Sequence, residues 1–129
     1  MGETEAVRLL LVDDDPAFLS MLEALAGGLA GFVVVGTATD ATAAVELARS
    51  LRPDLIVADV QMPHVDGLDA AALIHAELGT PAVILTGNAP TADRNRAQLA
   101  GALGWCSKSD LDGLEEILRR VSADLAPRD

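Results

Sequence analysis

Four apolar runs in this chain lead into polar residues of the kinds that a phosphoryl-transfer site needs. The polar residues, each after its run, are Asp13 to Asp15 after 7–12, Asp59 after 55–58, Thr86 after 82–85, and Lys108 after a weaker run around Trp105 and Cys106. In an open parallel α/β sheet, ligands bind beyond the carboxyl ends of the strands. If the runs are neighbouring strands, three or four carboxylates, one hydroxyl and one ammonium converge on one surface.

This set of side chains predicts phosphoryl transfer to a carboxylate. Asp59 becomes a nucleophile only if it is fixed and desolvated beside a stabilising charge. Carboxylates as close as Asp13 and Asp14 would repel it, and a divalent cation removes that repulsion. Oxygen-only ligands with open positions favour Mg²⁺. Lys108 and Thr86 then supply an ammonium and a hydroxyl for the phosphoryl oxygens.

Short apolar runs alternate with amphipathic segments along the chain, which indicates an α/β protein. The expected strands are 7–12, 32–35, 55–58, 82–85 and 103–107, and the expected helices follow them, with the third over 67–78 and a weak fourth over about 91–99. Continuous apolar strands are typical of a parallel sheet that is buried on both faces. We therefore expect a flavodoxin-like doubly wound sheet of five strands in the order 2-1-3-4-5.

Polar residues mark the starts of three of the expected helices. Asp15 followed by Pro16 suits a cap and a first turn, and Thr39 or Asp40 caps the second helix. Ser109 is the expected cap of the last helix, with Asp112 three residues later.

The overall composition limits the classes of function. The 129 residues carry a net charge of −11, which argues against direct contact with nucleic acid or an anionic membrane. The lone cysteine, Cys106, excludes an internal disulfide, and no apolar stretch reaches the ~20 residues of a membrane span. We expect a cytoplasmic protein of one domain over 1–129, with a core over about 7–125 and a tail or linker start at 126–129.

The pattern LLLVDDDPAF…PDLIVADVQMPHVDG…PAVILTG…GWCSK resembles the response-regulator receiver domain along nearly the whole chain. The resemblance implies a switch in bacterial two-component signalling that takes a phosphoryl group from a histidine kinase or phosphotransfer protein. It makes Asp59 the phosphoacceptor, Asp14 a direct Mg²⁺ ligand and Asp13 a ligand mainly through water. The backbone carbonyl of Gln61 would complete the metal ligands.

The resemblance also implies how the switch works. Thr86 would move to hold the phosphoryl group, Lys108 would pair with it, and Trp105 has the place of the family's switching aromatic. Apart from the resemblance, the side chains of Gln61 and Asn88 could flank the phosphoryl group and tune dephosphorylation, although a simple polar loop explains them nearly as well. The domain would catalyse its own phosphorylation and dephosphorylation without being a classified enzyme.

Two departures from the family pattern bear on the output and on the switch. The family often has proline directly after the lysine, where this chain has Ser109. The sequence K-S-D-L at this place resembles that of the subgroup with a C-terminal helix-turn-helix domain. This resemblance implies control of transcription through a DNA-binding domain outside this chain. Trp105 is larger than the usual Tyr or Phe, so an inward rotation needs a larger pocket.

Two other functions compete with this interpretation. A stand-alone or phosphorylation-independent receiver-like module would only bind partners, and it is favoured if Asp59→Asn leaves partner affinity and output unchanged. An aspartyl-nucleophile phosphatase would use Asp13 in place of Asp59, but the chain lacks room for that family's cap. The receiver resemblance further implies a homodimer through the fourth helix, fifth strand and fifth helix.

Overall fold

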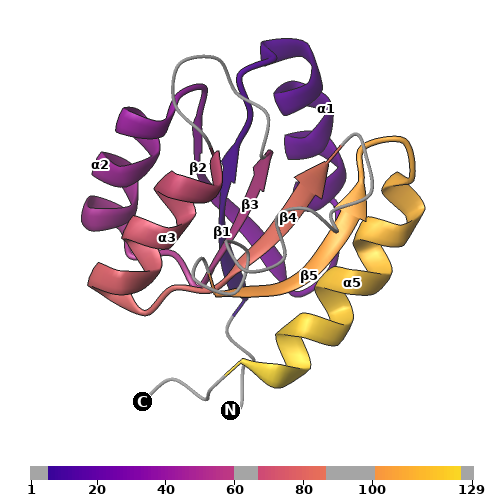
Figure 1. The fold of residues 1–129 in the computed structure, drawn as a ribbon. Helices are drawn as coiled ribbons and strands as arrows, with labels where there is room; N and C mark the ends of the chain where they lie inside the picture. The colour runs from indigo at the N-terminus through magenta and orange to yellow at the C-terminus, as the bar shows by residue number, and fades with distance from the viewer. Residues whose placement is uncertain (1–5, 60–66, 87–100, 126–129) are drawn as a thin grey trace.

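A computed structural model describes residues 6–59, 67–86 and 101–125, which form one parallel sheet with flanking helices (Figure 1). The elements are β1 (Val7–Val12), α1 (Pro16–Gly27), β2 (Phe32–Ala38), α2 (Ala41–Leu51), β3 (Leu55–Asp59), α3 (Gly67–Leu78), β4 (Ala82–Thr86), β5 (Ala102–Ser107) and α5 (Leu111–Asp124). The strand order is β2-β1-β3-β4-β5. The predicted flavodoxin-like sheet is confirmed, while the helix predicted over about 91–99 lies outside the described residues.

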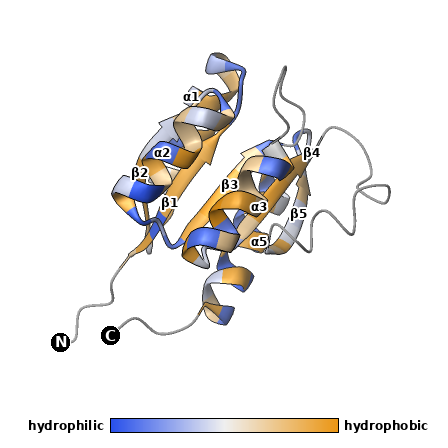
Figure 2. Ribbon diagram, turned by 60° about the vertical axis from the view of Figure 1, so that its left-hand side comes forward, coloured by the Kyte–Doolittle hydropathy of each residue, from blue (hydrophilic) through white to orange (hydrophobic). Residues whose placement is uncertain are grey.

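Helices cover both faces of the sheet, as Figure 1 shows, with α1 and α5 on one face and α2 and α3 on the other. Each face has its own aliphatic core, in which side chains from alternate strand positions pack against the helices. Leu9, Leu11 and Val57 belong to the α1–α5 face, whereas Leu10 and Ile56 belong to the α2–α3 face. The central strands are therefore apolar on both sides (Figure 2).

The strand register brings the carboxyl ends of the strands together at one edge. Asp59 on β3 pairs with Leu85 on β4, so Thr86 lies one residue beyond it and pairs with Ser107 on β5. The amide of Asp13 donates to the carbonyl of Ala38 at the end of β2, 3.0 Å away. The polar residues predicted from the four runs therefore follow neighbouring strands.

Aspartates cap three helices of the described chain. The carboxylate of Asp15 accepts from the amide of Ala17 at the start of α1, and that of Asp40 accepts from the amide of Ala43 in α2. The prediction of Ser109 as the cap of the last helix is wrong. Asp110 caps α5 instead, and the amide of Ser109 donates to the hydroxyl of Ser107 at 3.2 Å.

Strand β2 extends three residues beyond the predicted end at Val35, to Ala38. Gly36 allows this because a Cβ built there would lie 2.8 Å from a methyl group of Leu51 on α2. The glycine is a point of close helix–strand packing.

A second close approach joins α3 to the start of β5. His75 Nδ1 lies 3.2 Å from the carbonyl oxygen of Thr80, and its ring packs over Gly101. Gly101 has φ +68°, and a Cβ there would lie 2.5 Å from His75 Nδ1. Both the backbone conformation and the ring therefore require glycine at this position.

No helix in the described part of the chain has the length and apolar character needed to cross a membrane.

Candidate functional site

Three carboxylates gather at the carboxyl edge of the sheet. Asp13 and Asp59 are 0% and 2% exposed, and Asp14 is half-buried. One oxygen from each lies within 4.8 Å of the others. Asp13 and Asp14 follow β1 and Asp59 ends β3, so the pairing of these adjacent strands creates the cluster.

Local hydrogen bonds fix the carboxylate of Asp13. Its Oδ1 accepts from the amide of Asp15 at 2.8 Å, which links the acidic turn to the cap of α1. Its Oδ2 is buried and makes no hydrogen bond to any described residue. The ammonium of Lys108 lies 2.8 Å from this oxygen as an ion pair. Among the described residues, this buried oxygen is therefore contacted by one ammonium, which it shares with Asp59.

Lys108 connects the carboxylates across the sheet. Its Nζ lies 2.8 Å from Asp13 Oδ2 and donates to Asp59 Oδ2 at 3.3 Å. It also lies 4.3 Å from the centroid of the Phe18 ring on α1, within the range of a cation–π interaction. Burial lowers the pKa of Lys108, but close contact with Asp13 and the charge of Asp59 outweigh that effect and hold the pKa above its usual value. Lys108 therefore remains an ammonium, and it is the only lysine in the sequence.

The turn after β5 positions this lysine. The amide of Asp110 donates to the carbonyl of Ser107 at 3.0 Å, and the hydroxyl groups of Ser107 and Ser109 lie 2.8 Å apart. The carboxylate of Asp110 then caps α5. Lys108 is thus held between the end of one strand and the start of a capped helix.

The donor set fits a divalent cation of the Mg²⁺ type. Hard cations prefer oxygen ligands, and carboxylates this close together repel one another unless cations neutralise them. Asp13, Asp14 and Asp59 each offer one carboxylate oxygen within 4.8 Å of the others, which is a donor set that such a cation could bridge. A lone ammonium does not neutralise three carboxylates.

The structure thus brings together the predicted residues Asp13, Asp14, Asp59 and Lys108. Thr86 lies at the expected strand end by register, and its side chain is outside the described atoms. Gln61 and Asn88 lie outside the described residues, so their predicted roles stay predictions.

Trp105 and Cys106 lie on opposite faces of β5. Trp105 pairs with Ile84 and packs, half-buried, against the core under α2 and α3. Cys106 belongs to the core under α1 and α5, and its thiol donates to the carbonyl of Asp110 at 3.2 Å. Burial raises the pKa of the Cys106 thiol, and the charge of Asp110 adds to the rise. Cys106 is therefore a core residue rather than a reactive thiol.

The sequence interpretation missed the role of Phe18. It lies on the first turn of α1, three residues after the cap Asp15, with its ring beneath the ammonium of Lys108. One signal could have indicated it, because Phe18 is one of only two phenylalanines and lies three residues after the last aspartate of the acidic turn.

A family model described as the response regulator receiver domain matches residues 9–119. The chain belongs to the response-regulator receiver family. Receiver domains bind Mg²⁺ at an acidic pocket, and their partners are histidine kinases or phosphotransfer proteins. The described part of this chain has a cluster of three aspartates.

Curated relatives and solved structures agree with this membership. The chain is 39% identical over 107 residues to protein-glutamate methylesterase/protein-glutamine glutaminase 2 of Anaeromyxobacter dehalogenans, covering 83% of this chain and 31% of the relative. It is 39% identical over 125 residues to the DNA-binding response regulator MtrA of Mycolicibacterium smegmatis, covering 95% of this chain and 52% of that protein. The chain therefore spans about a third to a half of the length of these relatives.

Among solved structures, a two-component response regulator of the LuxR family from Aurantimonas superposes with a TM-score of 0.86. The identity is 31%, with 94% of this chain and 88% of that chain covered. The response regulator domain of Thermotoga maritima CheB gives a TM-score of 0.81 at 26% identity, covering 95% of this chain and all of that one. The chain therefore shares its fold with a LuxR-family response regulator and with the response regulator domain of CheB.

Proposed function

We propose that Asp59 accepts a phosphoryl group from the phosphohistidine of a sensor histidine kinase or phosphotransfer protein. The observation that carries the proposal is the buried carboxylate of Asp59 at a strand end, hydrogen-bonded to the ammonium of Lys108 at 3.3 Å. A carboxylate oxygen of Asp59 forms a bond to phosphorus as the phosphorus–nitrogen bond of the donor breaks. The bonding electron pair stays with the imidazole nitrogen.

The surrounding charges support such a transfer. Phosphoryl transfer depends mainly on positioning and on stabilisation of the charge on the equatorial oxygens. Lys108 is fixed between Asp13 and Asp59 and can pair with a phosphoryl oxygen. The Phe18 ring, with its centroid 4.3 Å from Nζ, adds a cation–π contact that helps to position the ammonium.

Asp13, Asp14 and Asp59 are the proposed ligands of Mg²⁺, with the carbonyl of Gln61 as a further one. The ion would supply charge neutralisation between these carboxylates and the incoming phosphoryl oxygens. Asp13 is prearranged for this task, because the amide of Asp15 holds its Oδ1 while its Oδ2 faces the ammonium that it shares with Asp59.

The switching residues form the next part of the proposal. Thr86 would hold the phosphoryl group, and Trp105 would respond through its packing against the neighbouring core. Gln61 and Asn88 would tune the lifetime of the aspartyl phosphate. The expected dimer face includes β5, on which Leu103 is 42% exposed.

For the output we propose transcription, through a DNA-binding domain outside this chain. The sequence K-S-D-L after β5 and the similarity to MtrA support this proposal. The methylesterase relatives match at similar identity, so a receiver coupled to an enzymatic domain is the specific alternative.

Intact mass spectrometry after incubation with phosphoramidate or acetyl phosphate tests the acceptor. We expect one Mg²⁺-dependent phosphoryl adduct, mapped to Asp59 by peptide fragmentation and absent from Asp59→Asn. Asp54→Asn is a matched control, because Asp54 follows α2 at the opposite edge of the sheet and its side chain accepts from the amide of Arg8. Fluorescence of Trp105, the only tryptophan, reports the accompanying change in packing.

Two other results of this experiment would favour the competing functions. An adduct on Asp13 would indicate the phosphatase-type nucleophile. A folded protein that binds Mg²⁺ but forms no adduct with small donors or with a phosphorylated histidine kinase would support a module that signals without phosphate.

A further inference from the structure

The ammonium of Lys108 is held by the same carboxylates that are the proposed metal ligands. Its two ion pairs, at 2.8 and 3.3 Å, are with carboxylate oxygens of Asp13 and Asp59. Both carboxylates belong to the acidic cluster, in which one oxygen of each residue lies within 4.8 Å of the others. A divalent cation in this cluster and the ammonium would therefore compete for the same two carboxylates.

This competition weakens the attachment of Lys108 when the carboxylates bind Mg²⁺. Carboxylates that are neutralised by a divalent cation attract an ammonium less, and the cation itself repels the ammonium. The lysine side chain has a flexible stem of four carbons, so the turn after β5 fixes its backbone but not its Nζ. The side chain of Lys108 is 26% exposed. Without a further partner, the ammonium would therefore turn into the solvent.

Phe18 offers a partner that carries no charge. Its ring centroid lies 4.3 Å from Lys108 Nζ, and the face of an aromatic ring attracts a cation through its quadrupole. A cation bound by the carboxylates does not occupy this face. Phe18 is half-buried and packs against the aliphatic core under α1 and α5, so the core restricts the movement of the ring. The cation–π contact therefore persists when the ion pairs weaken.

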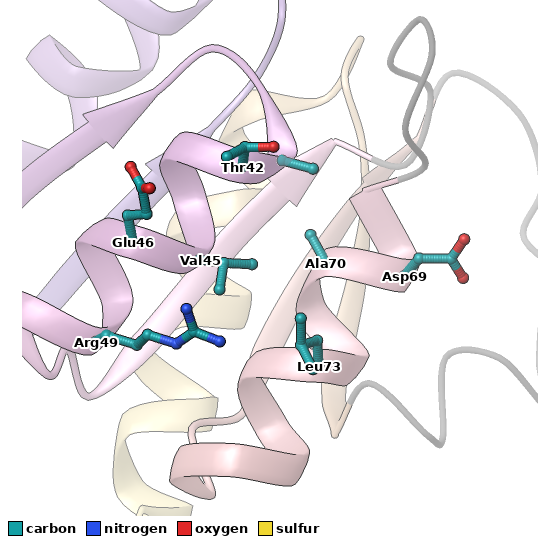
Figure 3. Close-up of a pocket in the computed structure, with 8 residues that line it drawn as sticks. Thr42, Val45, Glu46, Arg49, Asp69, Ala70 and Leu73 are labelled. Carbon is teal, nitrogen blue, oxygen red and sulfur yellow. The ribbon is translucent and has the colours of Figure 1, made fainter.

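The described pocket on the other face of the sheet takes no part in this arrangement. It is a hollow of about 370 Å³ between α2 and α3, with Val45 and Leu73 on its two sides (Figure 3). Its lining includes neither Lys108 nor the residues that contact the ammonium in the described structure. A substitution in this hollow can therefore serve as a control for a loss of packing elsewhere.

We propose that Phe18 is a positioning residue, which keeps the ammonium of Lys108 beside Asp59 while the carboxylates bind Mg²⁺. The inference rests on the proposed function, which assigns Mg²⁺ to the acidic cluster and a phosphoryl oxygen to Lys108. A cation–π contact is weaker than a charge-assisted hydrogen bond to a phosphoryl oxygen. The ring therefore holds the ammonium in place before the transfer and releases it to the incoming phosphoryl group.

NMR of the chain labelled with ¹³C-lysine tests where the ammonium lies. Because Lys108 is the only lysine in the sequence, the spectrum contains one Cε–Hε signal of lysine. Protons above the face of an aromatic ring resonate upfield of their usual position, so this signal reports contact with Phe18. We expect the upfield shift in the wild type and in Phe18→Tyr, both in EDTA and in excess Mg²⁺. Phe18→Leu and Phe18→Met, two variants that keep an apolar side chain without a ring, should lose it.

The rate of phosphorylation by acetyl phosphate in Mg²⁺, followed by intact mass, measures the consequence for the reaction. Phe18→Leu should form the adduct roughly three- to tenfold more slowly than the wild type, which is the range expected for the loss of one cation–π contact. Phe18→Tyr should keep the rate of the wild type because it keeps the ring.

Two controls separate this role from packing. Phe32→Leu makes the same change at the only other phenylalanine, which begins β2 and pairs with Val7 at the start of β1, away from the strand ends that lead to the site. Leu73→Ala removes a half-exposed apolar side chain from the hollow between α2 and α3. Both should retain the upfield lysine signal and the rate of the wild type.

Several results would overturn the inference. One is a lysine signal at the same position in the wild type and in Phe18→Leu, and another is a wild-type signal that moves to the position of Phe18→Leu when Mg²⁺ is added. A rate that falls equally in Phe18→Tyr or in Phe32→Leu would show an effect of packing alone. A wild type that keeps the upfield signal in Mg²⁺ but forms no adduct would support the role of Phe18 and count against the proposed phosphoryl transfer.

Discussion

Replacing Lys108 with methionine removes the ammonium between Asp13 and Asp59 while keeping most of the side-chain length. At an effective dielectric constant of about 20, the contacts of 2.8 and 3.3 Å correspond to gross attractions of about 6 and 5 kcal/mol. Desolvation of three charged groups offsets most of this attraction, and Lys108 is 26% exposed. Breaking a buried pair costs about 3–5 kcal/mol, and the partial exposure places the expected loss near about 3 kcal/mol.

Urea unfolding in EDTA, followed by Trp105 fluorescence, measures this loss directly. We expect the midpoint to fall while the slope stays constant. Mg²⁺ should then restore more stability to Lys108→Met than it adds to the wild type, because the ion neutralises carboxylates that have lost their ammonium. Arg120→Met, which removes an exposed positive charge from α5, should change stability by less than about 0.5 kcal/mol.

Two results would refute this reasoning. One is an unfolding free energy of Lys108→Met in EDTA equal to that of the wild type. The other is a loss of the same size in Arg120→Met, which would show that the effect is one of overall net charge and not of the buried pair.

Four further predictions follow from the described contacts. The pKa of Lys108 is higher in the folded protein than its unfolded value of 10.5, so the ammonium stabilises the folded state fully below pH 10.5. This stabilisation is lost as the pH rises through the folded pKa, and the difference in unfolding free energy between the wild type and Lys108→Met should shrink there. Gly101→Ala should lower the free energy of unfolding in a urea titration by about 2–3 kcal/mol, because the left-handed backbone and the His75 ring both oppose the new Cβ. Adding His75→Ala to this variant should recover only the part of the loss that is due to the ring. Asp40→Ala should cost about 1 kcal/mol by the same assay through loss of the α2 cap, whereas Asp40→Asn should cost little. Cys106 should react with a thiol reagent at pH 8 at least about tenfold more slowly in the folded protein than in urea, because burial raises the pKa of its thiol; equal rates would contradict its placement in the core.

The main features of the sheet and of the carboxylate cluster could be predicted from the sequence because they depend on short-range patterns. An apolar run that ends at an aspartate marks both a buried strand and the position of its polar end, as for β1 with Asp13 and β3 with Asp59. The parallel arrangement then aligns these ends without knowledge of any individual contact.

Features that depend on contacts between distant segments could not be predicted in this way. The extension of β2 through Gly36 depends on Leu51 of another element. The place of Phe18 beneath Lys108 depends on the packing of α1 beside the turn after β5. The prediction chose the wrong cap for α5 because Ser109 and Asp110 are both good capping residues. The sequence does not show that Ser109 forms hydrogen bonds with Ser107 instead.

The unusual amine content of this protein has a practical consequence. Because Lys108 is the only lysine in this sequence, amine-coupling reagents used for dyes, crosslinking or biosensor immobilisation modify a side chain of this domain only there. Acylation of Lys108 would remove the cation between Asp13 and Asp59, so a labelled or immobilised sample would be altered at its candidate site. The single thiol offers no alternative because Cys106 is buried. Conjugation therefore needs a cysteine introduced on an exposed surface such as the outer face of α5, with the native thiol left protected by the core.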